Sequence, residues 1–281
     1  MTELRKHALS DEVPTLRIRD LSIKFARRRG PDLSVVDGVS LDIWPREIVG
    51  VIGESGSGKT LTAMATLQML PKRALVASGT IHLSDTSLHD RTEREMRALR
   101  GDRIALIPQD AMQSLNPTMR IGRQVGEPLE LHSGFGVARA REAARKLLES
   151  VHIREPETRV REYPHQFSGG MQQRAMIAMG LALNPQLIIA DEPTTALDVT
   201  VQAQVLKLLR EIRDRDGASI LFITHDLGVV AEICDWVYVM RQGRIVEEGA
   251  VRQIFTAPKA DYTRELLDAT PSIHTTIGVR P

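Results

Sequence analysis

The sequence has a single cysteine and almost no net charge. Cys234 alone cannot form an internal disulfide or a metal site built from several cysteines, which favours a reducing, cytoplasmic setting. Lysine and arginine number 37 against 36 acidic residues, so the net charge of +1 does not indicate a nucleic-acid binder or a polybasic membrane anchor. Charge alone therefore names no partner.

Long hydrophobic runs are also absent. The longest apolar stretches are short pieces such as "IVGVIG" and "LIIA", whereas a bilayer-spanning helix needs roughly 20 apolar residues. The opening stretch, "MTELRKHALSDEVPTLRIRD", carries charges throughout and lacks the apolar core of a signal peptide, so we expect no export. Any membrane role should then depend on a partner. With 281 residues, 42% of them apolar, the chain is long enough to bury a sizeable core.

Alternating apolar and polar residues mark the start of the folded chain. "LRIRDLSIKF", from Leu16, and "VSLDI" are typical of half-buried strands in an antiparallel sheet. An apolar strand, "EIVGVIG", then precedes a helical pattern, "LTAMATLQML", closed by Pro71. Later, "QLIIADEP" and "SILFITHD" flank the helical stretch "TVQAQVLKLLREIRDRDG". Strands that alternate with helices predict a mostly parallel sheet covered by helices. The apolar helix face should consist of Val201, Val205, Leu208, Leu209 and Ile212.

A helical and loop-rich stretch, roughly residues 110–171, separates these two blocks. We interpret it as a helical subdomain inserted into the α/β core. Its arginines and glutamates are expected to form i,i+4 pairs on a solvated face, rather than a charged binding surface. Near the end, "VYVMRQGRIVEEGA" predicts two short strands around a turn. The main domain should span residues 13–255, and residues 256–281 should form a short helix and a loose tail.

The stretch "GESGSGKT" matches the full G-x-x-x-x-G-K-[ST] phosphate loop, with a strand before it and a helix after it. Glycines let backbone N–H groups and the helix N-terminus face a phosphate group. Lys59 should reach the β- and γ-phosphates of a nucleoside triphosphate, and Thr60 should offer its hydroxyl to Mg²⁺. A chance glycine-rich turn is the alternative, which the strand–helix context disfavours. The other predicted nucleotide contacts are Gly53, Glu54, Ser55, Gly56, Ser57 and Gly58.

An acidic pair follows the apolar segment "LIIA". Asp191, at the end of the predicted strand, should hold Mg²⁺ through water. Glu192 should point the opposite way along the strand, toward the γ-phosphate, where a carboxylate can orient and deprotonate an attacking water. An Asp-Glu pair alone is a weak signal. Its place about 130 residues after the phosphate loop, followed by "PTTALD", makes it a strong one.

Together these motifs make the chain resemble the ATP-binding subunit of an ABC transporter, and in particular the ATPases of peptide- and nickel-type importers. The resemblance covers nearly the whole chain. Its matching stretches are "IPQD" with Gln109 for the Q-loop, "FSGGMQQR" for the signature, "LIIADEP" for Walker B, "TALD" with Asp198 for the D-loop and "ITHD" with His225 for the switch histidine. It implies an α/β P-loop NTPase fold: an ABC ATPase core with an N-terminal antiparallel β subdomain and an inserted helical subdomain. ATP and Mg²⁺ are the implied cofactors.

In this family two ATPase subunits face each other head to tail, and each ATP lies between the phosphate loop of one and the signature of the other. A serine hydroxyl and glycine N–H groups at a helix start can bind an anion without a lysine. A simple helix N-cap by Ser168 is compatible with the same geometry. The implied contacts to the partner's ATP are Ser168, Gly169, Gly170, Met171, Gln172 and Asp198.

The resemblance also implies roles for His225, Gln109 and Phe25. His225 would polarise the γ-phosphate and hold Glu192 in place, although a buried core histidine is the alternative. Gln109 would join Thr60 on Mg²⁺, and its neighbourhood, "DAMQSLNPTMRIGRQV", would accept a coupling helix of the membrane partner. Phe25 resembles the aromatic residue that stacks on adenine, with a core position as the alternative.

Two departures from the family pattern bear on which ATPase partner and which transported solute we expect. Met171 stands where glutamine is commonest, as in one of the two distinct subunits of heteromeric peptide-type importers, so we infer a non-identical ATPase partner. The tail "FTAPKADYTRELLDATP" resembles the peptide-importer ending but lacks the cysteine-bearing extension that often follows it. The missing extension argues against dipeptides and leaves nickel, opines, glutathione and oligopeptides open as solutes.

The resemblance further implies two permease subunits, an extracytoplasmic solute-binding protein that acts indirectly, and no nucleic acid. The chain would lie peripherally on the cytoplasmic face of the inner membrane. One alternative is a soluble or enzyme-associated ABC ATPase, but the chain has neither a long coiled-coil insertion nor a second cassette. A non-hydrolysing structural partner is another, against which Lys59, Asp191, Glu192 and His225 all argue.

Overall fold

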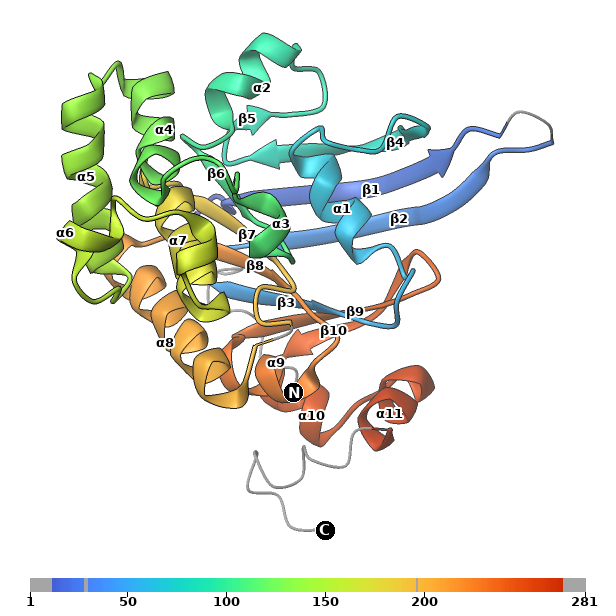
Figure 1. Cartoon of the computed structure of the whole chain (residues 1–281). Helices are drawn as coiled ribbons and strands as arrows, with labels where there is room; N and C mark the ends of the chain where they lie inside the picture. Colours follow the sequence, from blue (N-terminus) through green and yellow to red (C-terminus); the bar gives the residue numbers. More distant parts are fainter. Residues whose placement is uncertain (1–11, 28–29, 196, 270–281) are drawn as a thin grey trace. The chain divides into compact units, whose positions relative to one another are not determined.

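The chain divides into two compact units. The structure is a computed structural model that describes residues 12–27, 30–195 and 197–269 (Figure 1). Unit 1 comprises Met1–Met96 and Ser219–Pro281, and unit 2 comprises Arg97–Ala218. The predicted tail beyond residue 269 lies outside the described residues. In the described part of the chain, every helix is too short or too polar to cross a bilayer.

Unit 1 contains the predicted antiparallel sheet. Buried Leu16 and Ile18 alternate with exposed or half-buried residues, but the alternation slips by one residue before Leu21 and Ile23. The slip coincides with a shift in strand register next to Asp20, whose φ is 48°, and such a bulge lets both apolar pairs face the same core. The strands, in the order β2-β1-β4-β5, are β2 (Leu33–Ile43), β1 (Leu16–Phe25), β4 (Ala74–Leu83) and β5 (Thr86–Ser87) (Figure 1).

Unit 1 also holds the mostly parallel strands that carry the phosphate loop. β3 runs parallel to both β8 and β9, while β9 and β10 form an antiparallel hairpin as predicted. Every residue of β3 and β8 is buried, which explains their continuous apolar sequences. The strands are β3 (Ile48–Ile52), β8 (Ser219–Ile223), β9 (Trp236–Arg241) and β10 (Arg244–Ala250), and the helices are α1 (Lys59–Thr66), α9 (Leu227–Ile233), α10 (Val251–Thr256) and α11 (Asp261–Asp268).

Unit 2 holds a parallel strand pair and most of the helices. α2 (Glu93–Leu99) leads into it, and residues 110–171 are helical and loop-rich as expected; the proposed domain and subdomain boundaries remain predictions. The strands are β6 (Ile104–Ile107) and β7 (Leu187–Asp191). The helices are α3 (Ala111–Ser114), α4 (Ile121–Ser133), α5 (Val137–Ser150), α6 (Pro156–Arg159), the 3₁₀ turn η2 (Pro164–Gln166), α7 (Gly169–Gly180) and α8 (Val199–Asp216).

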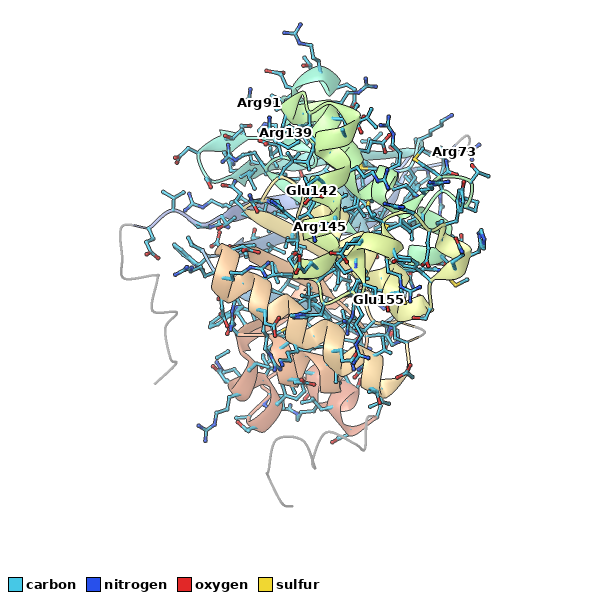
Figure 2. All side chains as sticks on the ribbon, turned by 60° about the vertical axis from the view of Figure 1, so that its left-hand side comes forward. Arg73, Arg91, Arg139, Glu142, Arg145 and Glu155 are labelled. Carbon is cyan, nitrogen blue, oxygen red and sulfur yellow. The ribbon has the colours of Figure 1, made fainter. Side chains whose placement is uncertain are left out.

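The charged face of α5 forms the predicted pairs. Arg145 contacts Glu142 on the same helix at 3.0 Å (Figure 2). It also contacts Glu149 at 3.3 Å, a pair with i,i+4 spacing, and Glu157 at 3.2 Å. Hydrogen bonding from Arg145 holds the pKa of the Glu142 carboxyl below its ordinary value. These pairs lie at the surface, so they contribute little to stability. The expectation of a solvated, internally paired helix face is confirmed.

Candidate functional site

The phosphate loop connects β3 to α1 in unit 1, as the sequence predicts. Gly53 has a φ of 146°, and a Cβ atom there would lie 2.1 Å from the carbonyl oxygen of Met240, so no larger residue fits. Gly58 is the N-cap of α1 and supplies no side-chain acceptor to its first turn. The positive end of the helix is therefore not capped by a side chain, which suits an anionic ligand.

Lys59 places a buried positive charge on the loop. Its side chain is 6% exposed, and Nζ donates hydrogen bonds to the carbonyl oxygens of Gly53 at 2.7 Å and Glu54 at 2.8 Å. Thr60, the next residue, is exposed in the first turn of α1. A fixed ammonium, an uncapped helix start and a glycine loop together fit the phosphate groups of a nucleotide.

Tyr262 contacts the phosphate loop, and sequence reasoning had not identified it. It comes from α11, is 4% exposed, and its hydroxyl oxygen accepts a hydrogen bond from the backbone N–H of Glu54 at 3.2 Å. The guanidinium of Arg241 lies over its ring, 4.5 Å from the centroid. Burial raises the pKa of the Tyr262 hydroxyl, so the group is neutral near pH 7. The "YT" of the family-like tail was the available signal, but its contact lies 208 residues away in sequence.

The acidic pair lies at the end of β7 in unit 2. All five residues of β7 are buried, and Asp191, the last of them, is 5% exposed. The strand ends there, because Glu192 adopts a left-handed backbone with φ of 47°. The argument that Glu192 points opposite to Asp191 by strand alternation is therefore wrong. Its direction is set by this turn, and left-handed conformations in non-glycine residues are often found at functional sites.

Glu192 is held by two donors in the same unit. Its Oε2 accepts a hydrogen bond from Gln109 Nε2 at 2.9 Å and from Thr195 Oγ1 at 3.0 Å. Gln109 follows β6 and Glu192 follows β7, and since these strands are parallel their ends meet at one edge. The two donors fix the orientation of a half-buried carboxylate. Sequence reasoning had not identified Thr195.

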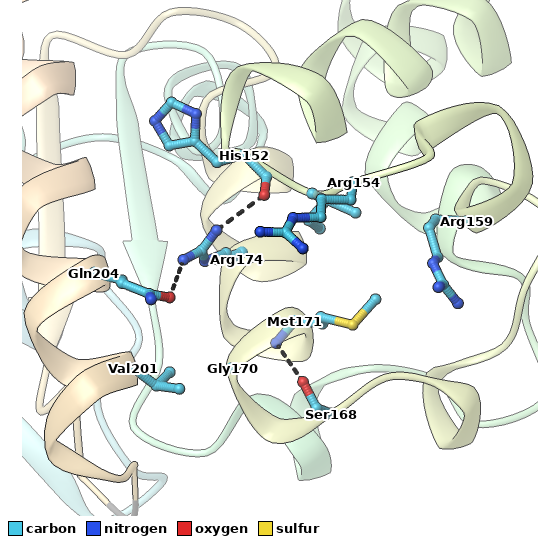
Figure 3. A pocket seen from close by; sticks show the side chains of 10 residues that line it. His152, Arg154, Arg159, Ser168, Gly170, Met171, Arg174, Val201 and Gln204 are labelled. Atoms are coloured by element: carbon cyan, nitrogen blue, oxygen red, sulfur yellow. Dashed lines mark hydrogen bonds between the residues drawn. The ribbon is translucent and has the colours of Figure 1, made fainter.

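The signature segment begins α7, and its two glycines have different surroundings. Ser168 is the N-cap, and its Oγ accepts from the Met171 N–H at 3.3 Å (Figure 3). A Cβ at Gly170 would lie 2.5 Å from Val201 Cγ1 of α8, so helix packing alone requires this glycine. Gly169 has open space around it. Of the two signature glycines, only Gly169 has no neighbour among the described residues of the unit that would exclude a larger side chain.

The other predicted site residues are distributed over both units. The Gln172 side chain is 5% exposed and donates to the carbonyl oxygens of Pro164 and Phe167, which stabilises the loop before α7. Asp198 caps α8 by accepting from the Val201 N–H at 2.9 Å. His225 is exposed after β8, which excludes the alternative of a buried core histidine. Phe25 is half-buried at the end of β1. The nucleotide contacts of all four remain predictions.

Comparison with known proteins identifies the family. The family described as "ABC transporter" matches residues 36–195. The "Peptidoglycan transport ATP-binding protein YejF" of Agrobacterium fabrum is 52% identical over 92% of this chain and 47% of its own length. The "Oligopeptide transport ATP-binding protein OppD" of Bacillus subtilis is 46% identical over 92% of this chain and 72% of its own. The chain thus spans about half of the first relative and nearly three quarters of the second.

A solved structure supports the same assignment. The cassette MJ0796, in a dimeric "post-hydrolysis state" bound to ADP and Pi, superimposes with a TM-score of 0.73 at 27% identity, covering 84% of this chain and 99% of that one. The match covers nearly all of that cassette, so the two chains share a fold. The chain therefore belongs to the ABC transporter family and carries its ATPase cassette.

Proposed function

We propose that the chain is the ATP-hydrolysing subunit of a membrane importer for peptides or related small solutes. The observation that carries the hydrolytic part is the carboxylate of Glu192, held by Gln109 and Thr195 next to the buried Asp191. The solute class is suggested by relatives whose names refer to peptidoglycan and oligopeptide transport. Nickel and other small solutes remain within the proposal.

Nucleotide binding is assigned to the residues of the phosphate loop. Lys59 would contact the β- and γ-phosphates, and the start of α1 would face them with its positive end. Phe25 would stack on the adenine ring. The remaining loop residues, Gly53 to Gly58, would contact the phosphates mainly through their backbone.

A magnesium ion fits the donor chemistry of three residues. Thr60 offers a hydroxyl, Asp191 a carboxylate and Gln109 an amide oxygen, all of them oxygen ligands as this ion requires. Because Gln109 Nε2 donates to Glu192, the Oε1 atom of Gln109 remains available to coordinate the ion. When bound, Mg²⁺ would neutralise charge that develops on the transferred phosphate.

Hydrolysis is assigned to Glu192, which would orient the attacking water and accept its proton. The hydrogen bonds from Gln109 and Thr195 prevent the carboxylate from rotating, so less reorganisation accompanies the reaction. His225 would polarise the γ-phosphate as a further positive or donor group. Most of the rate enhancement would come from positioning and charge rather than from covalent chemistry.

A second ATPase subunit would complete each nucleotide site, and we propose that it is not identical to this chain. Ser168 Oγ accepts the Met171 N–H, which leaves the serine hydroxyl hydrogen for a phosphate oxygen of the partner's ATP. Gly169, Gly170, Met171 and Asp198 would lie near the same ATP, and Gln172 would act by holding their loop.

Two permease subunits would connect the ATPase pair to the solute, which an extracytoplasmic binding protein delivers. The Q-loop neighbourhood offers an apolar contact for a coupling helix, since the side chain of Met112 is 70% exposed. The chain would then lie on the cytoplasmic face of the inner membrane through its partners. No observation favours the alternative of a soluble ABC ATPase.

Copurification and turnover of the assembled complex test the function. An affinity-tagged chain, expressed with its neighbouring gene products, should retain two permease subunits and a second ATPase. Its ATP turnover should rise when a solute-loaded binding protein is added, and Ser168→Ala should lower that turnover. Full activity from an isolated monomer, with a specific rate independent of protein concentration and of Ser168→Ala, would contradict the proposal.

Removing the Tyr262 hydroxyl should weaken ATP binding. Tyr262→Phe keeps the ring beneath Arg241 but leaves the Glu54 N–H without this acceptor, so the loop is held less firmly. We expect the dissociation constant for ATP to rise by about 2–10-fold, as for the loss of one hydrogen bond. Calorimetric titration with nucleotide measures it.

Tyr238→Phe is the matched control for this variant. The Tyr238 hydroxyl accepts a backbone N–H from Asp42 at 3.0 Å, elsewhere in unit 1. Tyr238→Phe should lower the melting temperature about as much as Tyr262→Phe does, and it should leave the affinity for ATP unchanged. Equal affinities in the two variants would show that Tyr262 does not support the loop.

A further inference from the structure

Two backbone contacts from the β9–β10 hairpin hold the phosphate loop in unit 1. Gly243, in the turn of the hairpin, donates its N–H to the carbonyl oxygen of Ser57 at 3.0 Å. At the start of the loop, the carbonyl oxygen of Met240 lies so close that a Cβ atom at Gly53 would be 2.1 Å from it. β9 pairs with β3, the strand that leads into the loop, so both contacts come from backbone that the sheet fixes.

A third contact to the loop comes from α11, a helix that is not part of the sheet (Figure 1). The Tyr262 hydroxyl accepts the Glu54 N–H at 3.2 Å. α11 has eight residues, of which Tyr262 and Thr263 are buried. A helix this short has little stability of its own in water, because its few hydrogen bonds do not recover the cost of forming the first turn. The position of Tyr262 therefore depends on what anchors α11.

Glu247 of β10 anchors the start of α11. Its side chain is buried, and each of its two carboxyl oxygens accepts a backbone hydrogen bond. Oε1 accepts from the Lys259 N–H at 2.7 Å, and Oε2 accepts from the Ala260 N–H at 3.0 Å. Ala260 is the N-cap of α11 and supplies no side-chain acceptor. Glu247 thus binds the N-cap N–H from another element, as the glutamate of a capping box does within its own helix.

A buried carboxylate needs hydrogen bonds in place of its lost hydration, and the start of α11 provides two of them. Moving α11 away would leave these buried groups unsatisfied, so Glu247 and α11 should keep one fixed arrangement. We propose that Glu247 is a positioning residue for nucleotide binding: it holds α11 so that Tyr262 accepts the Glu54 N–H and keeps the phosphate loop in its binding conformation. The role in nucleotide binding rests on the proposed function, whereas the link from Glu247 to Glu54 consists of contacts within unit 1 alone.

Amide hydrogen exchange of the nucleotide-free chain, measured by NMR, tests the link from Glu247 to the loop. Glu247→Ala leaves the Lys259 and Ala260 N–H groups without this acceptor, so α11 should be held less firmly. The Glu54 amide should then exchange about 2–10-fold faster, as for the loss of one hydrogen bond, and Tyr262→Phe should have the same effect. Glu247→Gln keeps the shape and one acceptor oxygen, so it should show a smaller effect in the same direction, and it replaces Glu247→Ala if that variant does not fold.

A double-mutant cycle tests whether Glu247 acts on nucleotide binding through Tyr262. Calorimetric titration measures the dissociation constant for ATP in Glu247→Ala, in Tyr262→Phe and in the variant that carries both changes. Each single change should raise this constant by about 2–10-fold. The double variant should bind ATP no more weakly than the weaker of the two single variants, because the second change removes a contact that is already lost. A residue that only stabilised the fold would lower the melting temperature without this coupling.

Glu265→Ala is the control for loss of a carboxylate, because Glu265 is exposed on α11 itself. It should change neither the exchange of Glu54 nor the affinity for ATP, and thermal unfolding should show that all variants are folded. Unchanged exchange at Glu54 in Glu247→Ala, or single effects on ATP affinity that multiply in the double variant, overturns the proposal. Unchanged ATP affinity in Glu247→Ala, while Lys59→Ala weakens binding, overturns the positioning role alone. Full affinity in a folded Lys59→Ala chain instead overturns the assignment of the nucleotide to the phosphate loop.

Discussion

Replacing Glu192 with glutamine should lower ATP turnover by about 10²–10⁴-fold and leave ATP binding intact. The amide has nearly the same shape, and its oxygen can still accept hydrogen bonds from Gln109 and Thr195, so the turn after β7 is preserved. What is lost is the ability to take a proton from water. Phosphate release measures turnover, and nucleotide titration measures binding.

The same variant should accumulate ATP-bound pairs with the second ATPase subunit, because the nucleotide that joins them is not consumed. Size-exclusion chromatography with ATP, and then with ADP, detects this difference. Glu149→Gln, at an exposed position of the same unit, is the control and should behave as the unmodified chain. Unchanged turnover in Glu192→Gln would remove Glu192 from the role of general base.

The phosphate loop could be predicted from sequence because its constraints are local. The eight residues from Gly53 to Thr60 connect one strand directly to the next helix. A strand pattern, a motif and a helix pattern in immediate succession specify the same geometry. Nothing distant is needed to recognise it.

The geometry around Glu192 and Tyr262 could not be predicted in the same way. Successive side chains point to opposite faces only while the strand continues. The left-handed φ of 47° at Glu192 ends the strand, and the periodicity of "LIIADEP" does not indicate it. The hydrogen bond between Gln109 and Glu192 joins residues 83 positions apart, and that between Glu54 and Tyr262 joins residues 208 apart. Such contacts depend on tertiary packing, which local patterns do not describe.

Element boundaries show the same limit. The pattern predicted a first helix closed by Pro71, but α1 ends at Thr66 because Gln68 adopts a left-handed backbone with φ of 51°. β4 and β6 were not predicted: much of β4 is exposed, so it lacks a clear alternation, and β6 has only four residues. Short or weakly patterned strands become recognisable only through their neighbours in a sheet.

Replacing Lys59 with alanine should weaken ATP binding by about 100-fold. The variant removes a 6% exposed ammonium that no neighbouring cation of the loop can replace, and a phosphate oxygen would lose a charge-assisted hydrogen bond. It also leaves the carbonyl oxygens of Gly53 and Glu54 without this donor, so a melting temperature a few degrees lower is expected. Calorimetric titration with ATP measures affinity, and thermal unfolding shows that the variant is folded. Lys72→Ala, at an exposed lysine of the same unit, should change neither quantity. A folded Lys59→Ala chain with full affinity for ATP would mean that the loop does not bind the phosphates, and the nucleotide would then have to be bound elsewhere on the chain.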